Sequence, residues 1–298
     1  MPAKTNLDFK ATLKLFREQA EGALRTLVPP ARTRPAILHE AMRYSLEAGG
    51  KRLRPILVLA GHALFPSKID PLPAAVAVEC LHTYSLIHDD LPCMDDSDLR
   101  RGVPTCHKQF DEETALLAGD ALLTYSFWLL ADGYRKHPII SHGLVLDLAD
   151  AAGSRKLIGG QMEDLLAEKS PPNAERLRFI HHNKTAALIT ASLVMGLRLT
   201  GAGPAKLKLM ADVGRHLGLA FQAIDDILDA TADSATLGKT AGLDARHGKL
   251  TYASLYGLEA SRKKARALTQ AAIRAAQKLG GNNAFLLELI RDMEHRVN

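Results

Sequence analysis

Apolar residues recur at three- and four-residue spacing through most of this chain of 298 residues. That spacing places apolar side chains on one face of an α-helix, so it predicts helices rather than strands. Proline and glycine residues, which end or kink helices, separate the segments. They cluster at 29–30, 49–50, 66–73, 92, 138, 171–172, 201–204 and 238–248. We therefore expect roughly ten helices packed into an all-α bundle.

Three of the predicted segments are apolar around most of their circumference: 72–91, 174–200 and 205–230. A surface helix keeps one polar face, so helices of this kind are expected in the centre of a large bundle. No shift in composition marks a linker, and the sequence contains no internal repeat or low-complexity tract. We interpret residues 1–298 as a single domain.

The composition agrees with a helical fold. Hydrophobic residues make up 47% of the chain and aromatic residues only 5%, and runs rich in β-branched residues are few, which favours helix over strand. The net charge of +5 and the pI near 9.1 suit an anionic substrate or a nucleic-acid surface, although many soluble proteins are mildly basic. No Lys/Arg tract with interleaved aromatic residues indicates a nucleic-acid partner.

The cysteines and the hydropathy pattern bear on the compartment. The three cysteines, Cys80, Cys93 and Cys106, have spacings that form no disulfide framework, so a reducing compartment fits best. The N-terminus has no apolar signal segment. No stretch approaches the ~18 apolar residues of a membrane span, the longest being 185–197. We expect a cytoplasmic protein without stable membrane insertion.

A first cluster of aspartates, Asp89, Asp90 and Asp95, ends one of the central helices. Carboxylates crowded beside apolar segments repel one another, so cations or strong donors must neutralise them. Asp89 and Asp95 are six residues apart, a spacing that a straight helix does not align, but Pro92 can turn the later aspartates back toward the earlier ones. The alternative is that this cluster is only the acidic, solvent-exposed end of a helix. A calcium loop over residues 95–98 would lack the Gly and the distal Glu of an EF-hand.

A second cluster follows a mostly apolar segment, residues 217–224. Asp225 and Asp229 are at i and i+4 on one helix face, and Asp226 is next to them. The alternative is that these aspartates are exposed surface residues that only increase solubility. Two facing sets of hard oxygen ligands suit Mg²⁺, which usually shares its remaining coordination positions with water and substrate phosphates.

Several cations accompany these acids. The run Gly50-Lys51-Arg52-Leu53-Arg54 combines a glycine turn with side chains that bind phosphate oxygens well, and Arg100 and Arg101 follow the first acidic cluster. Further cations are Lys184, Lys239 and Lys249. Short basic runs are common on protein surfaces, so this run alone is weak evidence. Together with the metal-binding carboxylates, these cations indicate a site that binds two diphosphates.

The ordered set of motifs resembles the trans-isoprenyl diphosphate synthases, and most of all the bacterial farnesyl diphosphate synthases. The matching motifs are Gly50-Lys-Arg-Leu-Arg-Pro, His82 to Asp95, Leu99-Arg-Arg-Gly, Gly159-Gly-Gln-Met-Glu-Asp-Leu, Lys184-Thr185, Phe221 to Asp229 and Gly238-Lys239-Thr240. The resemblance extends over residues 35–256. It implies an all-α isoprenoid-synthase bundle around a deep central cavity, a homodimer, and two or three Mg²⁺ ions, for which Mn²⁺ is a possible substitute.

The resemblance also implies roles for single residues. The allylic diphosphate would be held through the metals by Asp89, Asp90, Asp95, Asp225, Asp226 and Asp229, with help from Arg100, Lys184 and Lys239. Isopentenyl diphosphate would occupy the pocket of Lys51, Arg54, His82 and Arg101. Thr185 and Gln222 would direct oxygen dipoles at an allylic carbocation, and Lys249 would be a cation near the site entrance. The implied reaction joins isopentenyl diphosphate to dimethylallyl and geranyl diphosphate, and yields (2E,6E)-farnesyl diphosphate.

The length of the product depends on the helix that carries Asp89. Side chains four residues earlier lie about 6 Å along the axis, so they can form a floor for the growing tail. Tyr84 is bulky enough for this role and Ser85 offers little obstruction, although Tyr84 could equally be an ordinary core residue. In the related family a smaller residue at this position goes with geranylgeranyl products, which is the alternative product here.

One segment departs from the family pattern, and other functions compete. Arg155-Lys156 stands where the family usually has small or apolar residues, which puts local packing or a dimer contact in doubt, whereas Gln161 and Asp164 are retained as supporting residues.

A zinc module built from the cysteines and nearby histidines has no recognised ligand spacing. A terpene cyclase usually mixes Asn, Ser or Thr into its second metal motif. A noncatalytic synthase subunit typically lacks carboxylates from one motif.

Overall fold

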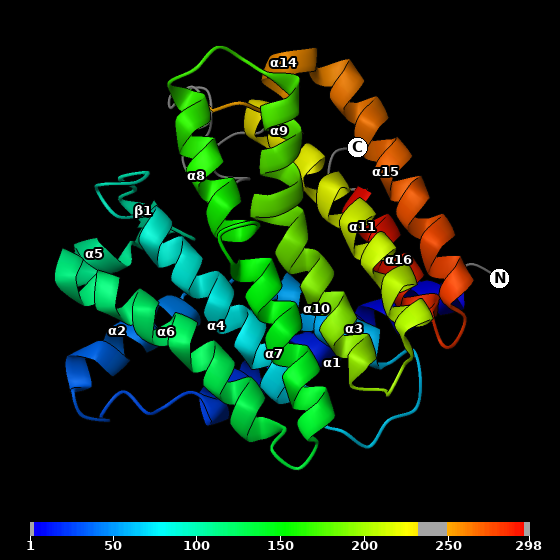
Figure 1. The fold of residues 1–298 in the computed structure, drawn as a ribbon, viewed down its shortest axis with the longest axis horizontal. Helices are drawn as coiled ribbons and strands as arrows, with labels where there is room; N and C mark the ends of the chain where they lie inside the picture. The colour runs from blue at the N-terminus through cyan, green and yellow to red at the C-terminus, as the bar shows by residue number, and fades with distance from the viewer. Residues whose placement is uncertain (1–2, 232–248, 295–298) are drawn as a thin grey trace.

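The computed structural model describes residues 3–231 and 249–294, and nearly all of these residues form helices (Figure 1). The helices are α1 (Ala3–Leu27), α2 (Ala36–Glu47), α3 (Leu53–His62), α4 (Leu72–Asp89), α5 (Cys106–Gln109), α6 (Glu112–Gly133), α7 (Pro138–Ala152), α8 (Leu157–Glu168), α9 (Ala174–Ile180), α10 (Ala187–Arg198), α11 (Pro204–Thr231), α14 (Tyr252–Tyr256), α15 (Leu258–Leu279) and α16 (Ala284–Glu294). A π-helix, η1 (His181–Ala186), joins α9 to α10, and a hairpin of β1 (Leu99–Arg100) and β2 (Val103–Pro104) follows α4. The predicted all-α fold is confirmed, while the single domain over residues 1–298 stays a prediction.

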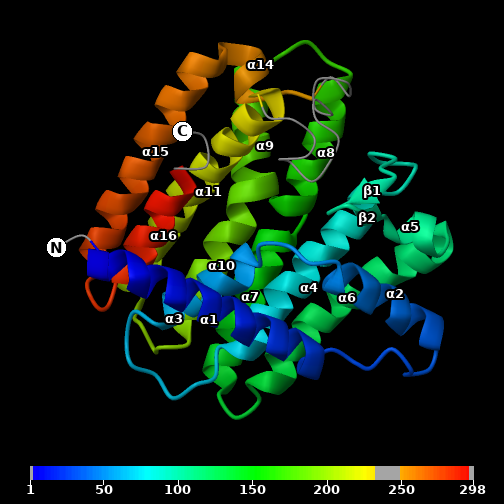
Figure 2. The ribbon, with the colours of Figure 1, turned by 180° about the vertical axis from the view of Figure 1, so that it is seen from behind.

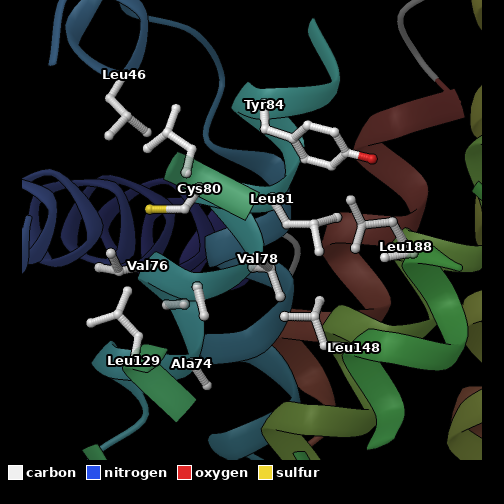
Figure 3. Packing of buried hydrophobic residues seen from close by; sticks show 14 of the residues in the cluster. Leu46, Ala74, Val76, Val78, Cys80, Leu81, Tyr84, Leu129, Leu148 and Leu188 are labelled. Carbon is white, nitrogen blue, oxygen red and sulfur yellow. The ribbon is translucent and has the colours of Figure 1, made fainter. Parts of the chain in front are cut away.

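Helix α4 lies in the centre of the bundle, as its apolar circumference predicts. Ala74, Ala75, Val76 and Ala77 are all buried, although consecutive side chains point about 100° apart around the helix. Helix α6 packs along one side of α4, and α3 and α10 along others. Figure 3 shows Leu148 and Leu188 packed against this core from other helices, with Tyr84 at one end of the cluster. The helix that ends in the first aspartate cluster is therefore rigidly enclosed.

A second core joins α3 and α10 to α11, α15 and α16, and α1 runs across the back of the molecule (Figure 2). Gly196 lets α10 approach α3 closely, because a Cβ at this position would lie 2.1 Å from the carbonyl oxygen of Val58. Helices α11 and α15 lie side by side (Figure 1). These contacts hold the end of α11, which carries the second aspartate cluster, in a fixed position relative to α4.

The structure differs from the sequence-based expectation in one helix. The segment 174–200, expected as one helix, contains the six-residue π-helix η1. A π-helical turn inserts an extra residue into the hydrogen-bond ladder, which the apolar periodicity does not reveal. Such turns are frequent at functional sites, and this one carries Lys184 and Thr185.

The expectation about membrane-length segments also needs correction. Helix α6 is long and apolar enough to cross a membrane by length and composition. Core helices pass the same test, so this is weak evidence of a span. Ala118 and Leu122 of α6 are fully buried in the bundle, whereas Leu117 and Trp128 are exposed.

The departure at Arg155-Lys156 is accommodated on the surface. Both residues form ion pairs with Asp150 of α7, Arg155 at 3.7 Å and Lys156 at a shorter distance. Arg155 is exposed and Lys156 precedes the first residue of α8. The two charges therefore lie at the surface and not in the packing between α7 and α8.

Candidate active site

The chain after α4 turns back on itself, as the position of Pro92 predicts. The backbone amide of Asp95 donates a hydrogen bond of 2.8 Å to the carbonyl of Asp89, and the amide of Ser97 donates to the carbonyl of Asp90 at 3.1 Å. These bonds bring Asp95 next to the helix end despite the six-residue separation. The three aspartates of the first cluster thus belong to one compact turn.

The short hairpin sends two consecutive arginines to different places. Arg101 and Gly102 form its turn with φ angles of 57° and 82°, the combination found in tight hairpin turns of type I′. The Arg100 guanidinium donates to the carboxylate of Asp90 at 3.1 and 3.2 Å. The Arg101 guanidinium instead donates to the carbonyl of Gly49 in the basic loop. One cation therefore lies at the acidic turn and the other at the basic run.

The basic run lines a cavity of about 540 Å³. The predicted isopentenyl diphosphate residues all contribute to its wall: Lys51, Arg54, His82 and Arg101. Gly50 has a φ of 122°, and a Cβ at this position would lie 2.6 Å from Cζ of Arg101. Only glycine permits both that backbone conformation and the close approach of the guanidinium. The structure thus brings together four residues from three separate segments of the sequence.

Crowded positive charge shifts the protonation equilibria in this cavity. Burial, together with the nearby Arg101, lowers the pKa of Arg54 to about 10, although Glu79 opposes the shift. Burial and the surrounding arginines lower the pKa of His82 well below its ordinary value. His82 is therefore neutral near pH 7 and offers one N–H donor. A bound anion would relieve the repulsion among these groups.

The second aspartate cluster lies at the end of α11, beside a cavity of about 160 Å³ whose wall includes Asp225 and Asp226. The two oxygens of Asp226 accept hydrogen bonds from Nε2 of Gln222 at 2.8 Å and from the amide of Tyr252 at 2.7 Å. Asp226 thus also anchors α14 to α11. Asp229 is buried on the same helix. The metal-binding roles of these three residues stay predictions.

The π-helix η1 places Lys184 and Thr185 beside the same cavity. Lys184 donates to Oδ2 of Asp164 at 2.6 Å, and the hydroxyl of Thr185 donates to Oε1 of Gln222. A Cβ at Gly160 would lie 2.3 Å from the backbone nitrogen of Lys184, so α8 can approach η1 only because this residue is glycine. The Gly159-Gly160 pair was the one sequence signal for this close contact.

Lys249 connects the two aspartate clusters. It lines the cavity beside Asp225 and donates to the carboxylate of Asp95 at 3.1 and 3.3 Å, from 154 residues away in sequence. Its predicted place near the site entrance stays a prediction. Lys239, predicted to bind the allylic diphosphate, lies outside the described residues.

Burial disfavours the charged forms of Asp89 and Asp90 in the first cluster. Burial raises the pKa of Asp89 to about 6, with a smaller rise from Asp95, while Lys184, Arg100 and Lys249 oppose the shift. Among residues 3–231 and 249–294, no three His, Cys, Asp or Glu side chains are gathered closely enough to hold a metal ion as they stand. The donor set is nevertheless made of hard carboxylate oxygens, which fit Mg²⁺ and not a soft metal.

Of the two predicted chain-length residues on α4, Tyr84 is buried and Ser85 is partly buried. Tyr84 is 5% exposed and forms an edge-to-face contact with His88, with ring centroids 5.4 Å apart. The hydroxyl of Ser85 donates to the carbonyl of His82 at 2.9 Å, so it is turned along its own helix. Burial, with smaller contributions from Asp89 and Asp120, raises the pKa of Tyr84 to about 12, so this ring is neutral near pH 7. The ring belongs to the main hydrophobic cluster, and its role as a floor for the growing tail stays a prediction.

The cysteines give no support to a zinc module. Cys80 and Cys106 are buried, and burial raises the pKa of both thiols, which disfavours the thiolate form that binds metal. Cys93 is exposed in the turn after α4. The retained Gln161 lies in α8, and Asp164 pairs with Lys184 as described above.

Comparisons with known proteins agree with this geometry. Residues 35–288 match the polyprenyl synthetase family. Geranylgeranyl pyrophosphate synthase 11 from Arabidopsis thaliana is 45% identical over 286 residues, which cover 92% of this chain and 77% of that protein. Farnesyl diphosphate synthase from Escherichia coli is 44% identical and covers 92% and 93%. A geranyltransferase from Helicobacter pylori, solved with magnesium and isoprenyl diphosphate, superposes with a TM-score of 0.85 at 37% identity and covers 96% of both chains.

Proposed function

The chain belongs to the polyprenyl synthetase family and is a trans-prenyltransferase that acts on isoprenyl diphosphates, and we propose that its product is (2E,6E)-farnesyl diphosphate. It would condense isopentenyl diphosphate first with dimethylallyl diphosphate and then with geranyl diphosphate. The observation that supports two diphosphate sites for this reaction is the divergence of two adjacent arginines. Arg100 lies at the acidic turn and Arg101 at the basic cavity, so one hairpin would serve two anion sites.

Isopentenyl diphosphate fits the basic cavity. Lys51, Arg54 and Arg101 present cationic donors, and neutral His82 adds an N–H donor without extra positive charge. Arginine forks bind phosphate oxygens in bidentate fashion, which also orients the bound molecule. The lowered pKa of Arg54 indicates repulsion that an anion would remove.

The allylic diphosphate is proposed to bind between the aspartate clusters, where Asp89, Asp95 and Asp225 would hold Mg²⁺ with the other predicted aspartates. When bound, Mg²⁺ supplies Lewis-acid stabilisation of the charge on the departing diphosphate. Lys184 and Lys249, now paired with Asp164 and Asp95, lie where they can donate to the same oxygens. Preorganised cations of this kind favour cleavage of the allylic C–O bond.

The protein's own groups can guide the carbocation that follows. The hydroxyl of Thr185 and the amide of Gln222 are hydrogen bonded to each other beside the second cluster, so their dipoles have a fixed orientation. Asp226 holds Gln222 in turn. The isopentenyl double bond would attack the cation, and the released diphosphate would accept the final proton, so no protein general base is required.

We propose that the side chain of Tyr84 limits the length of the product. Its buried ring lies on α4 before Asp89, where a growing tail directed into the bundle would meet it. Geranylgeranyl diphosphate is the second candidate, because relatives of similar identity include geranylgeranyl pyrophosphate synthases from plants. The terpene-cyclase alternative receives no support, since the matched family is a synthetase of polyprenyl chains.

A homodimer is also proposed. Helix α7 packs against both α6 and α8 (Figure 1), and all three helices carry large apolar side chains that are exposed. These are Leu117, Trp128, Leu146 and Met162, among others. Exposed apolar side chains gathered over adjacent helices are typical of a subunit interface. Light scattering on the purified protein measures its molar mass, and a mass near 32 kDa, that of one chain, would contradict this proposal.

A single assay tests the proposed reaction. The protein is incubated with isopentenyl diphosphate, each short allylic diphosphate and Mg²⁺, and the lengths of the dephosphorylated products are measured. A C15 product supports the proposal, a C20 product supports the second candidate, and no condensation refutes both. The cytoplasmic location stays a prediction, because relatives include both a bacterial enzyme and enzymes named as chloroplastic.

A further inference from the structure

Arg52 stands in the middle of the basic run but turns away from the other cations. Its side chain is 1% exposed. Nε donates to Oε1 of Glu21 at 2.6 Å, Nη1 donates to Oε1 of Glu79 at 2.8 Å, and Nη2 donates to the carbonyl of Leu46 at 2.6 Å. All three nitrogens of the guanidinium are therefore occupied by protein acceptors. Glu21 belongs to α1 and Glu79 to α4, so Arg52 ties two helices to the loop.

The backbone at Arg52 is in an unusual conformation. Its φ of 48° and ψ of 36° place a non-glycine residue in the left-handed region, immediately before the first turn of α3. Such a conformation costs free energy and persists only where surrounding contacts enforce it. The three hydrogen bonds of the guanidinium are the contacts that do so. This turn separates Lys51 from Arg54, and both of these residues line the cavity.

The two glutamates are unexpected at this place. Glu79 is 1% exposed, lines the same cavity as Lys51 and Arg54, and opposes the lowering of the Arg54 pKa. A carboxylate beside a diphosphate site repels the substrate, so its charge alone would weaken binding. A buried ion pair is also a poor source of net stability, because desolvation offsets the attraction. Neither substrate binding by charge nor general stability explains why these acids are here.

We infer that Glu21 and Glu79 act as positioning residues for the isopentenyl diphosphate site, through Arg52. They hold Arg52 in the left-handed turn, and this turn sets the directions in which Lys51 and Arg54 project into the cavity. Arg52 is then a structural member of the basic run and not a ligand of the diphosphate. This inference rests on the proposed function of the cavity.

The sign of the effect of Glu21→Ala separates positioning from simple electrostatics. Removal of a negative charge near the cavity would, through charge alone, lower the KM for isopentenyl diphosphate. Loss of positioning would raise it, by about tenfold, the scale of one charge-assisted hydrogen bond. The KM for geranyl diphosphate and the kcat at saturation should change by less than about twofold, because the aspartate site is untouched.

Glu18→Ala is the matched control. Glu18 lies one helical turn before Glu21 on α1, is exposed, and contacts only Lys14, at 3.8 Å, among the described ion pairs. It removes the same charge from the same helix without touching Arg52, so its KM values should equal those of the unaltered protein. A KM for isopentenyl diphosphate that falls or stays unchanged in Glu21→Ala overturns the inference.

Two further variants test the same inference independently of Glu21→Ala. Arg52→Lys keeps the charge but cannot reach three acceptors, so it should raise the same KM as Glu21→Ala does. If Glu21→Ala does not fold, Glu21→Gln, which keeps the side-chain shape, takes its place with the same expected direction. Condensation by the unaltered protein is measured first. Its absence refutes the proposed function, whereas condensation with no KM change in the variants refutes only the positioning role.

Discussion

Gly50→Ala tests the basic cavity most directly, because the structure predicts one local displacement. The new Cβ would lie 2.6 Å from Cζ and 2.8 Å from Nη1 of Arg101, and carbon atoms do not approach this closely. The guanidinium must therefore leave its place on the carbonyl of Gly49. The φ of 122° at Gly50 also strains any residue that has a side chain.

The magnitude follows from the interaction that is lost. A hydrogen bond to a charged group contributes about 1.5–3 kcal/mol, which corresponds to a change of about 10- to 150-fold in an equilibrium constant. Displacement of Arg101 should therefore lower kcat/KM for isopentenyl diphosphate by that factor. Arg100 keeps its contact with Asp90 on the other side of the hairpin, so the KM for geranyl diphosphate should stay within about twofold.

Gly49→Ala provides the control. Gly49 also has a positive φ, 85°, but a Cβ there would meet no atom within 4 Å. Both variants carry backbone strain of about 1–3 kcal/mol, so both should unfold at a lower temperature, but only Gly50→Ala displaces Arg101. Steady-state kinetics with each substrate varied in turn and thermal unfolding measure the two effects separately. Equal kinetic losses in the two variants would show that strain in the loop, and not the position of Arg101, controls binding.

Three further predictions address the product length, the second aspartate cluster and the stability of the fold. Tyr84→Ala should lengthen the product, measured by chromatography of the dephosphorylated alcohols, and an unchanged C15 product would remove Tyr84 from this role. Asp225→Ala should lower turnover at saturating Mg²⁺ by about 100-fold or more, whereas near-normal turnover would contradict the metal-centred mechanism. Burial lowers the pKa of His62 in the folded state, so the unfolded chain binds this proton more tightly. The stability of the fold should then decrease as the pH falls from the pKa of the unfolded chain, about 6.5, toward the lower pKa of the folded state. In His62→Gln the unfolding temperature should therefore change less between pH 7.5 and 5.5. If it changes as much as in the unaltered protein, His62 is not the group responsible.

Much of the fold was predictable because it depends on local pattern. The apolar circumference of residues 72–91 predicted a central helix, and α4 is buried on all sides. Pro92 predicted the turn that returns Asp95 to Asp89, since proline lacks the N–H that would continue the hydrogen-bond ladder beyond the first turn of a helix. The apolar period did not reveal η1, because one extra residue in a turn changes the ladder but not the average spacing.

The sequence by itself determined which chemical groups are available: two acidic clusters, a basic run after glycines, and a bulky residue before the first cluster. Only the tertiary structure decided which partners these groups contact. Arg100 and Arg101 are neighbours in sequence but contact Asp90 and Gly49, and Arg52 turns inward to Glu21 and Glu79. Lys249 reaches Asp95 across 154 residues. Side-chain partners at such separations depend on how helices pack, and no local periodicity encodes that packing.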